Sequence, residues 1–245
     1  MNKVFAIVKK ELWQYFFSPI AYIVLASFFL VNSFLFYIIL AAMSKAGSPS
    51  LSPIALLFGG TFFFWLLHLI IIPVITMRLV AEERKSGTIE TLLTSPLSDF
   101  QIVFGKFLSS FIFYFTAWGL TFVYAFILRS YSEVDWGPIL SGYLGVFLLG
   151  GLFLSIGLWA TIISKNQIVA AIISFSVMTM MVAITFLSFI LGSEKKEFVN
   201  YIDLLSIMEN FSKGMVDSRN VIYLLSGTIL FLALSVKSLE ARRWR

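Results

Sequence analysis

Cysteine is absent from this chain of 245 residues, and histidine occurs once, at His68. Without cysteine the chain can form neither a disulfide nor a thiolate metal site, and its redox compartment cannot be inferred. A single histidine also argues against a metal site built from histidines. We therefore expect this chain to bind no metal ion.

Charged residues are scarce as well, at 13% of the chain against about 25% in ordinary soluble domains. Apolar residues make up 59% and include 27 phenylalanines. A soluble fold would need polar residues to cover its outside, whereas lipid can face these side chains. The net charge of +5 is scattered over the ends of apolar stretches. That distribution argues against nucleic-acid binding, which needs a basic face.

Six apolar stretches are long enough to cross a bilayer, because about 30 Å of hydrocarbon needs roughly 20 helical residues. The last is the weakest, and its Lys237 can reach the headgroups from near the end of the span. The first is longer than the apolar core of a signal peptide, so we expect a retained anchor. The sequence predicts an all-α membrane protein, one domain over residues 1–245, with spans at 20–42, 54–77, 107–128, 139–163, 168–191 and 221–239.

The basic residues predict the orientation of these spans. An even number of spans places both termini on one side, together with residues 78–106 and 164–167. Twelve of the 18 lysines and arginines fall on that side and six on the other, whereas the acidic residues divide 6 against 7. Lysine and arginine are enriched in cytoplasmic loops. Both termini are therefore expected in the cytoplasm.

Two amphipathic segments lie outside the spans. Residues 3–16 place apolar side chains on one arc and lysines opposite, which is typical of an interfacial helix. The alternative is an extension of the first span, but Ser18-Pro19 opposes a continuous helix. In the external segment 192–220, apolar residues recur at helical spacing, from Leu204 to Met215. We expect this segment to pack against the span ends, with a place on or in the membrane surface as the alternative.

The loop 78–106 is the long charged connection between spans on the cytoplasmic side. It is rich in helix formers from Leu79 to Leu93, Pro96 ends that run, and Ser98 or Asp99 suits the start of a new helix. A solvated helical hairpin without a partner is one interpretation. A contact site for another protein is the other.

The motifs of this loop resemble those of type-2 ABC transporter permeases. Glu82-Glu83, Gly87-Thr88-Ile89-Glu90 and Leu92-Leu93-Thr94-Ser95-Pro96-Leu97-Ser98 follow the second span, and Gly105-Lys106 opens the third. Residues 211–223 and 238–245 are similar to the gliding-motility and copper-enzyme-maturation permeases of that family. The likeness covers essentially the whole chain.

The resemblance implies that residues 79–93 form a coupling helix, which docks into a cleft of a cytoplasmic ATPase. Glutamates beside Arg84 and Lys85 offer both signs of charge, and the two leucines supply an apolar anchor. Gly87 allows close approach or a bend. The predicted coupling residues are Glu82, Glu83, Arg84, Gly87, Thr88, Glu90, Leu92, Leu93, Pro96, Gly105 and Lys106.

No catalytic residue is predicted in this chain. Adjacent residues such as Glu82 and Glu83 point about 100° apart on a helix, so they do not form a two-carboxylate site. A phosphate-binding loop needs Gly-x-x-x-x-Gly-Lys-Ser/Thr, whereas Gly105-Lys106 is followed by Phe107 and lacks the earlier glycine. ATP and Mg²⁺ would therefore bind the partner ATPase, and this chain needs no cofactor.

The resemblance also implies the assembly and its location. It predicts an exporter in the bacterial cytoplasmic (inner) membrane, with two copies of the ATPase and a second copy of this permease or a related one. An accessory membrane subunit is a further candidate partner. Lipid, polysaccharide, peptide and drug all stay open as substrates, and so does a purely mechanical role.

Candidate residues for a transport pathway are His68, Ser174, Met178, Met181 and Thr185, because small hydroxyls and flexible methionine suit an amphipathic solute. An intramembrane histidine is a functional candidate by default. With no second acidic or basic residue deep in a span, a histidine bonded to a neighbouring helix is the favoured interpretation. In the fourth span, Gly151–Ser155 and Gly157–Thr161 have the spacing of close helix contacts. Pro73 is expected to kink the second span.

Two other classes of protein are disfavoured. A stand-alone secondary carrier or channel would show intramembrane charges or broken helices in repeated halves. An intramembrane enzyme would need a nucleophile, a base or metal ligands at depth, and His68 alone cannot supply them. The carrier or channel remains the alternative to the permease.

Overall fold

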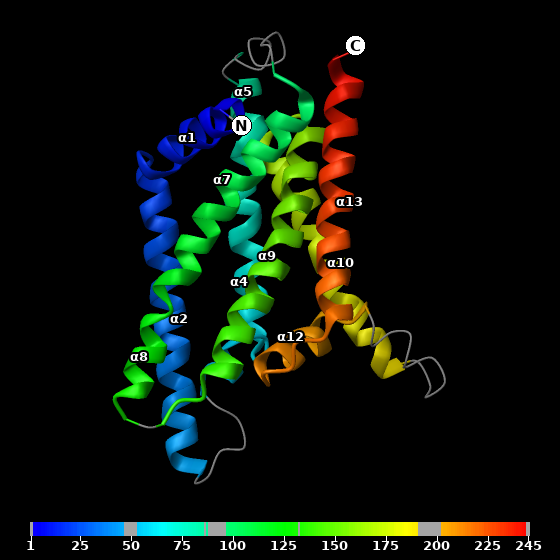
Figure 1. The fold of residues 1–245 in the computed structure, drawn as a ribbon. Coiled ribbons are helices and arrows are strands. Elements are labelled where there is room, and N and C mark those ends of the chain that lie inside the picture. Colours follow the sequence, from blue (N-terminus) through cyan, green and yellow to red (C-terminus); the bar gives the residue numbers. More distant parts are fainter. Residues whose placement is uncertain are drawn as a thin grey trace.

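The computed structural model describes residues 2–46, 53–85, 87, 97–131, 133–190 and 202–243. Within these ranges every regular element is an α-helix, and six segments are long and apolar enough to cross a membrane (Figure 1). The predicted all-α fold with six spans is therefore confirmed. The spans are Pro19–Ser44, Phe62–Arg84, Asp99–Arg129, Trp136–Ile163, Gln167–Ile184 and Ser218–Ala241.

Helix α1 (Asn2–Phe16) is separate from α2 (Pro19–Ala46), which forms the first span. The chain turns at Phe17 and Ser18, and Pro19 then occupies the first position of α2, where its missing N–H leaves no bond unmade. Helix α1 lies at the same end of the bundle as the C-terminal end of α13 (Ser218–Arg243) (Figure 1).

The second span is broken near one end instead of running unbroken from residue 54 to 77. Helix α3 (Pro53–Leu57) is followed by a turn, and α4 (Phe62–Thr76) starts afresh with Thr61 as its cap. Gly59 in this turn has φ 87°, a left-handed conformation that glycine adopts without strain. A Cβ atom on Gly59 would also lie 2.8 Å from Met208 Cβ. The second span predicted to start at residue 54 is thus corrected to two helices separated by a glycine turn. Hydropathy does not reveal this turn.

The junction between the second and third spans is helical on both sides. Helix α5 (Arg78–Lys85) follows α4 after Met77 alone, and Gly87, with φ 72°, turns the chain beyond it. Helix α7 (Asp99–Leu120) begins eight residues before the predicted start of the third span. Ser98 and Gln101 form a reciprocal capping box there, which satisfies two backbone N–H groups.

Helix α9 (Trp136–Ile163) is the central helix of the bundle (Figure 1). It contacts α4, α7, α10 (Gln167–Ile190), α12 (Leu204–Ser212) and α13. Helix α8 (Val123–Arg129) continues the third span after a turn at Thr121. Most of α9 is buried, so any movement of this helix is passed to several neighbours.

Helix α12 lies in the described part of the predicted external segment, residues 202–220, and it packs under the bundle. Phe211 is fully buried against Gly145 of α9, and Ser141 Oγ donates a hydrogen bond to the carbonyl of Phe211 at 2.6 Å. These contacts agree with the packing role expected for the segment.

Candidate functional site

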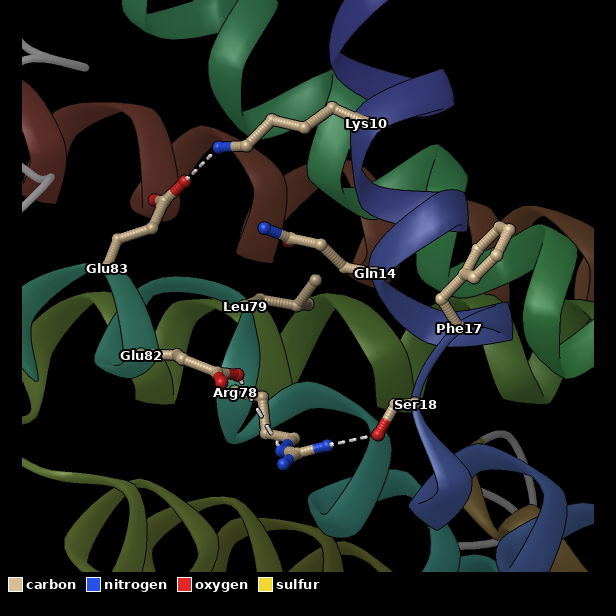
Figure 2. Close-up of a pocket in the computed structure, with 8 residues that line it drawn as sticks. All are labelled: Lys10, Gln14, Phe17, Ser18, Arg78, Leu79, Glu82 and Glu83. Carbon is tan, nitrogen blue, oxygen red and sulfur yellow. Dashed lines mark hydrogen bonds and ion pairs between the residues drawn. The ribbon is translucent and has the colours of Figure 1, made fainter. Parts of the chain in front are cut away.

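A polar pocket lies where α1 meets α5. Its volume is about 490 Å³, and Figure 2 shows its lining side chains, which come from α1, from the turn after it and from α5. Arg78 spans the pocket mouth, with Nη1 donating to Ser18 Oγ at 3.4 Å and Nε lying 3.7 Å from Glu82 Oε2. The lining residues are Lys10, Gln14, Phe17, Ser18, Arg78, Leu79, Glu82 and Glu83.

Behind this pocket, four charged residues form a network that we call the ion network: Lys10, Glu11, Glu83 and Lys106. The ammonium Nζ of Lys106 lies 2.7 Å from Glu11 Oε1 and 3.0 Å from Glu83 Oε2. Glu83 Oε1 in turn lies 3.0 Å from Lys10 Nζ (Figure 2). The side chain of Lys106 is only 1% exposed. The two positive and two negative charges of the ion network thus cancel. Together these side chains link α1, α5 and α7.

The outer member of the ion network, Lys10, is held in its charged form. Burial alone would lower the pKa of Lys10, but the hydrogen bond to Glu83 and the negative charges of Glu83 and Glu11 raise it above 10.5. A lysine with a raised pKa stays protonated throughout the physiological range. Lys10 therefore keeps its charge in the pair with Glu83, which links α1 and α5.

Tyr15 adds a neutral link from α1. Its hydroxyl donates to the carbonyl of Ile75 at 2.8 Å, near the end of α4. Burial raises the pKa of Tyr15 well above 10, with the charge of Glu11 acting in the same direction. The hydroxyl therefore keeps its proton and remains a donor.

A second set of contacts joins the α4–α5 junction to the end of α9. Arg84 donates to the carbonyl of Ile162, and Thr161 Oγ1 donates to the carbonyl of Met77 at 3.3 Å. Gly157 lets α9 approach α4 closely, since a Cβ atom there would overlap the hydroxyl of Thr76 and lie 2.8 Å from Thr76 Cβ. Helix α5 is thus tied both to α1 and α7 and to α9.

The predicted coupling residues fall into two groups in the structure. Glu82, with 59% of its side chain exposed, and Gly87 lie on the surface. Glu83 and Lys106 are buried in the ion network, and a Cβ atom on Gly105 would lie 2.8 Å from Ile7 Cγ2 of α1. Arg84 is half-buried against α9. Thr88, Glu90, Leu92, Leu93 and Pro96 lie outside the described residues, so the outer part of the predicted coupling helix stays a prediction.

Sequence reasoning missed the contribution of α1 to this site. Ile7, Glu11 and Tyr15 are spaced four residues apart, so they lie on one face of α1, which packs against the α4–α5 junction and α7. A single glutamate in line with apolar residues was the signal present in the sequence. An acidic residue on such a face needs a buried cation, and Lys106 supplies it.

The predicted pathway residues lie mostly in the interior. His68 is buried, with Nδ1 2.8 Å from the carbonyl of Phe64 and Nε2 2.8 Å from the hydroxyl of Tyr114. Ser174 and Met178 are buried and Met181 is half-buried, whereas the side chain of Thr185 lies outside the described part. Their role in transport stays a prediction. Among the described residues, no group of three histidine, aspartate or glutamate side chains is arranged to hold a metal ion.

Comparison with known proteins places the site in a family. A search of curated proteins found no significant match. The profile of the family described as ABC-2 family transporter protein matches residues 54–237, which include four of the six spans, most of the last span and the α5 junction. Helix α1, with Lys10 and Glu11, precedes the matched region. Because the match covers most of the chain, the protein belongs to the ABC-2 transporter family and is a membrane-spanning permease component of an ABC transporter.

Proposed function

We propose that this chain is the permease subunit of an ABC exporter, driven by a separate cytoplasmic ATPase that pushes on residues 79–93. Two permease chains and two ATPase copies would form the working unit, in a bacterial inner membrane with both permease termini in the cytoplasm. The excess of lysine and arginine on that side supports the orientation. The likeness of residues 211–223 and 238–245 supports a place in the gliding-motility and copper-enzyme-maturation branch.

The observation that carries this proposal is the double attachment of α5. The ion network ties α5 to α1 and α7, and Arg84 ties it to α9. Removing one partner of a buried ion pair costs about 3–5 kcal/mol, so loss of Lys106 or its carboxylates would disturb the attachment strongly. A push on α5 is therefore passed to α7 and α9, which lie in two different spans. Helix α5 has the connections required of a coupling element.

The exposed carboxylate of Glu82 is the described group best placed to contact the ATPase. Helix α5 presents it on the surface beside Arg78, while the neighbouring Glu83 points into the ion network. Charges at the rim of an interface steer association and select the partner. We expect Glu82 to face a basic side chain of the ATPase.

The test compares Glu82→Lys with Glu209→Lys. Both carboxylates pair with a basic residue one turn away, and their side chains are similarly exposed, at 59% and 62%. Only Glu82 lies on the proposed cytoplasmic side. We expect Glu82→Lys to weaken ATPase association about tenfold or more, because like charges in an interface cost several kcal/mol. Glu209→Lys should leave the association unchanged.

The measurement is co-purification with the ATPase, followed by ATP hydrolysis in liposomes. Unchanged association and stimulated hydrolysis in Glu82→Lys would contradict the coupling role of α5. An equal loss in Glu209→Lys would contradict the orientation. Substrate movement by the permease alone in liposomes would favour a stand-alone carrier.

A further inference from the structure

An apolar groove runs between α7 and α13, away from the α1–α5 pocket. Its volume is about 480 Å³, within the range of small-ligand sites. One wall consists of Phe100 and Phe104 of α7, whose rings stack with their centroids 5.6 Å apart. The other wall consists of Ile229, Leu232, Ala233 and Val236 of α13, which are spaced as one helical face.

The apolar part of the groove fits within one membrane leaflet. From Ile229 to Val236, α13 rises about 10 Å at 1.5 Å per residue. The hydrocarbon core of a bilayer is about 30 Å thick, so one leaflet accounts for about 15 Å. The groove begins beside the first turn of α7 and next to the end of α13, where the third and the sixth candidate spans have their ends at the same end of the bundle (Figure 1).

The surface end of this apolar groove carries both signs of charge. Lys237 and Glu240 line that end, and their Nζ and Oε2 atoms are 2.8 Å apart. A phosphate can join the ammonium of Lys237, and a primary ammonium can join the carboxylate of Glu240. A zwitterionic phospholipid headgroup supplies both groups at once. An anionic headgroup would match the ammonium of Lys237 but would be repelled by the carboxylate of Glu240.

We propose that the groove binds one zwitterionic phospholipid of this leaflet, with an acyl chain between α7 and α13 and its headgroup on Lys237 and Glu240. The lining is apolar except at the surface end, which suits an acyl chain attached to a charged headgroup. This site is independent of the proposed ATPase coupling.

The test uses native mass spectrometry of the full-length chain, released from vesicles with equal amounts of phosphatidylethanolamine and phosphatidylglycerol. We expect wild-type protein to retain one phosphatidylethanolamine per chain. Ala233→Trp should lose it, because the indole fills the groove. Leu230→Trp is the matched control, since Leu230 is an exposed residue of α13 outside the groove, and it should keep the lipid. Ala233→Leu is a second variant in case Ala233→Trp fails to fold. Because leucine is smaller than tryptophan, this variant should retain less lipid than wild type but more than Ala233→Trp.

The headgroup is tested with Glu240→Gln, which removes the carboxylate and should shift retention toward phosphatidylglycerol. Equal retention of both lipids by wild-type protein, or no shift in Glu240→Gln, would overturn the headgroup assignment. Equal lipid loss in Ala233→Trp and Leu230→Trp would overturn the groove as the site. Because the chain has no cysteine, Ala233→Cys provides a unique thiol. Efficient disulfide cross-linking of two such chains in vesicles would show that a second copy covers the groove.

Discussion

Lys106 Nζ lies 2.7 Å from Glu11 Oε1, although the two residues are 95 positions apart in the chain. One buried ammonium thereby fixes the N-terminal helix against the start of the third span. It also holds Glu83 of α5 at 3.0 Å. Lys106 is thus the shared partner of two carboxylates that come from α1 and α5.

Replacing Lys106 by methionine should therefore destabilise the protein strongly. The change leaves Glu11 and Glu83 buried without their shared cation, at a cost of about 3–5 kcal/mol. Thermal unfolding of the detergent-solubilised protein measures the loss. Lys213→Met is the control, because Lys213 forms an exposed pair with Glu209 and such pairs contribute about 0–1 kcal/mol. Similar losses in both variants would show that the ion network does not stabilise the junction.

The link between α1 and α5 should persist to strongly alkaline pH. Because the pKa of Lys10 in the folded protein is raised above 10.5, its stabilising contribution is complete below pH 10.5. That contribution is lost only as pH rises through the folded value. A spin label on Lys9→Cys, an exposed position of α1, reports the mobility of the helix. We expect an unchanged spectrum from pH 7 to 10 and greater mobility above that range.

Lys10→Gln provides the comparison for this titration. It should increase the mobility of α1 already at pH 7 and remove the alkaline transition. If α1 of the protein with Lys10 intact loosens between pH 7 and 9, a group other than Lys10 controls the contact.

Two glycines of α9 should respond in opposite directions to alanine. Gly157→Ala places a methyl group against the hydroxyl of Thr76 and 2.8 Å from Thr76 Cβ, and such overpacking costs about 1–3 kcal/mol. At Gly151 the nearest atom would be 3.7 Å away. Gly151→Ala should therefore be neutral or stabilise by up to about 1 kcal/mol, the difference in helix propensity. Denaturation of the two variants side by side measures both effects.

A double variant tests whether the stability lost in Gly157→Ala comes from the contact with Thr76. Adding Thr76→Ala should recover part of the lost stability, because the clashing hydroxyl is then removed. If Thr76→Ala raises the stability of the Gly157→Ala variant but not that of the Gly151→Ala variant, the effect lies in the α4–α9 contact.

Tyr114→Phe tests whether His68 has a structural role. The hydroxyl of Tyr114 contacts His68 Nε2 at 2.8 Å and the carbonyl of Val146 at 3.0 Å. Removing this hydroxyl leaves the buried Nε2 of His68 without its partner, which lowers the free energy of unfolding by about 1–3 kcal/mol. Tyr131→Phe, at an exposed position, should cost almost nothing. A changed substrate preference in Tyr114→Phe, with stability intact, would instead place His68 on the transport pathway.

Much of the fold followed from local sequence patterns. The six spans were visible because a run of about 20 apolar residues is typical of a helix that crosses hydrocarbon and rare in soluble domains. The start of α7 at Ser98 was also foreseeable, since a serine with a glutamine three residues later forms a capping box. The break at Gly59 was not visible in the hydropathy, and the close approach of Met208 to this glycine joins residues far apart in the chain.

The candidate site was only partly predictable for the same reason. Charged residues in a motif between two spans are easily read as exposed, and for Glu82 that reading holds. Glu83 and Lys106 are buried because α1 packs over them and supplies Glu11. Residue spacing within the loop carries no information about a helix some 70 to 95 positions earlier.

The turn at Gly59 separates α3 from α4. The backbone hydrogen-bond ladder stops between α3 and α4, so the stiffness of one helix does not extend into the other. Helix α3 stays packed on α12 at one membrane face, while α4 ends beside the ion network at the opposite face. An unbroken helix would carry every tilt at one end to the other end. Because the ladder is interrupted at Gly59, a tilt of α4 is not transmitted through a continuous helix to α3.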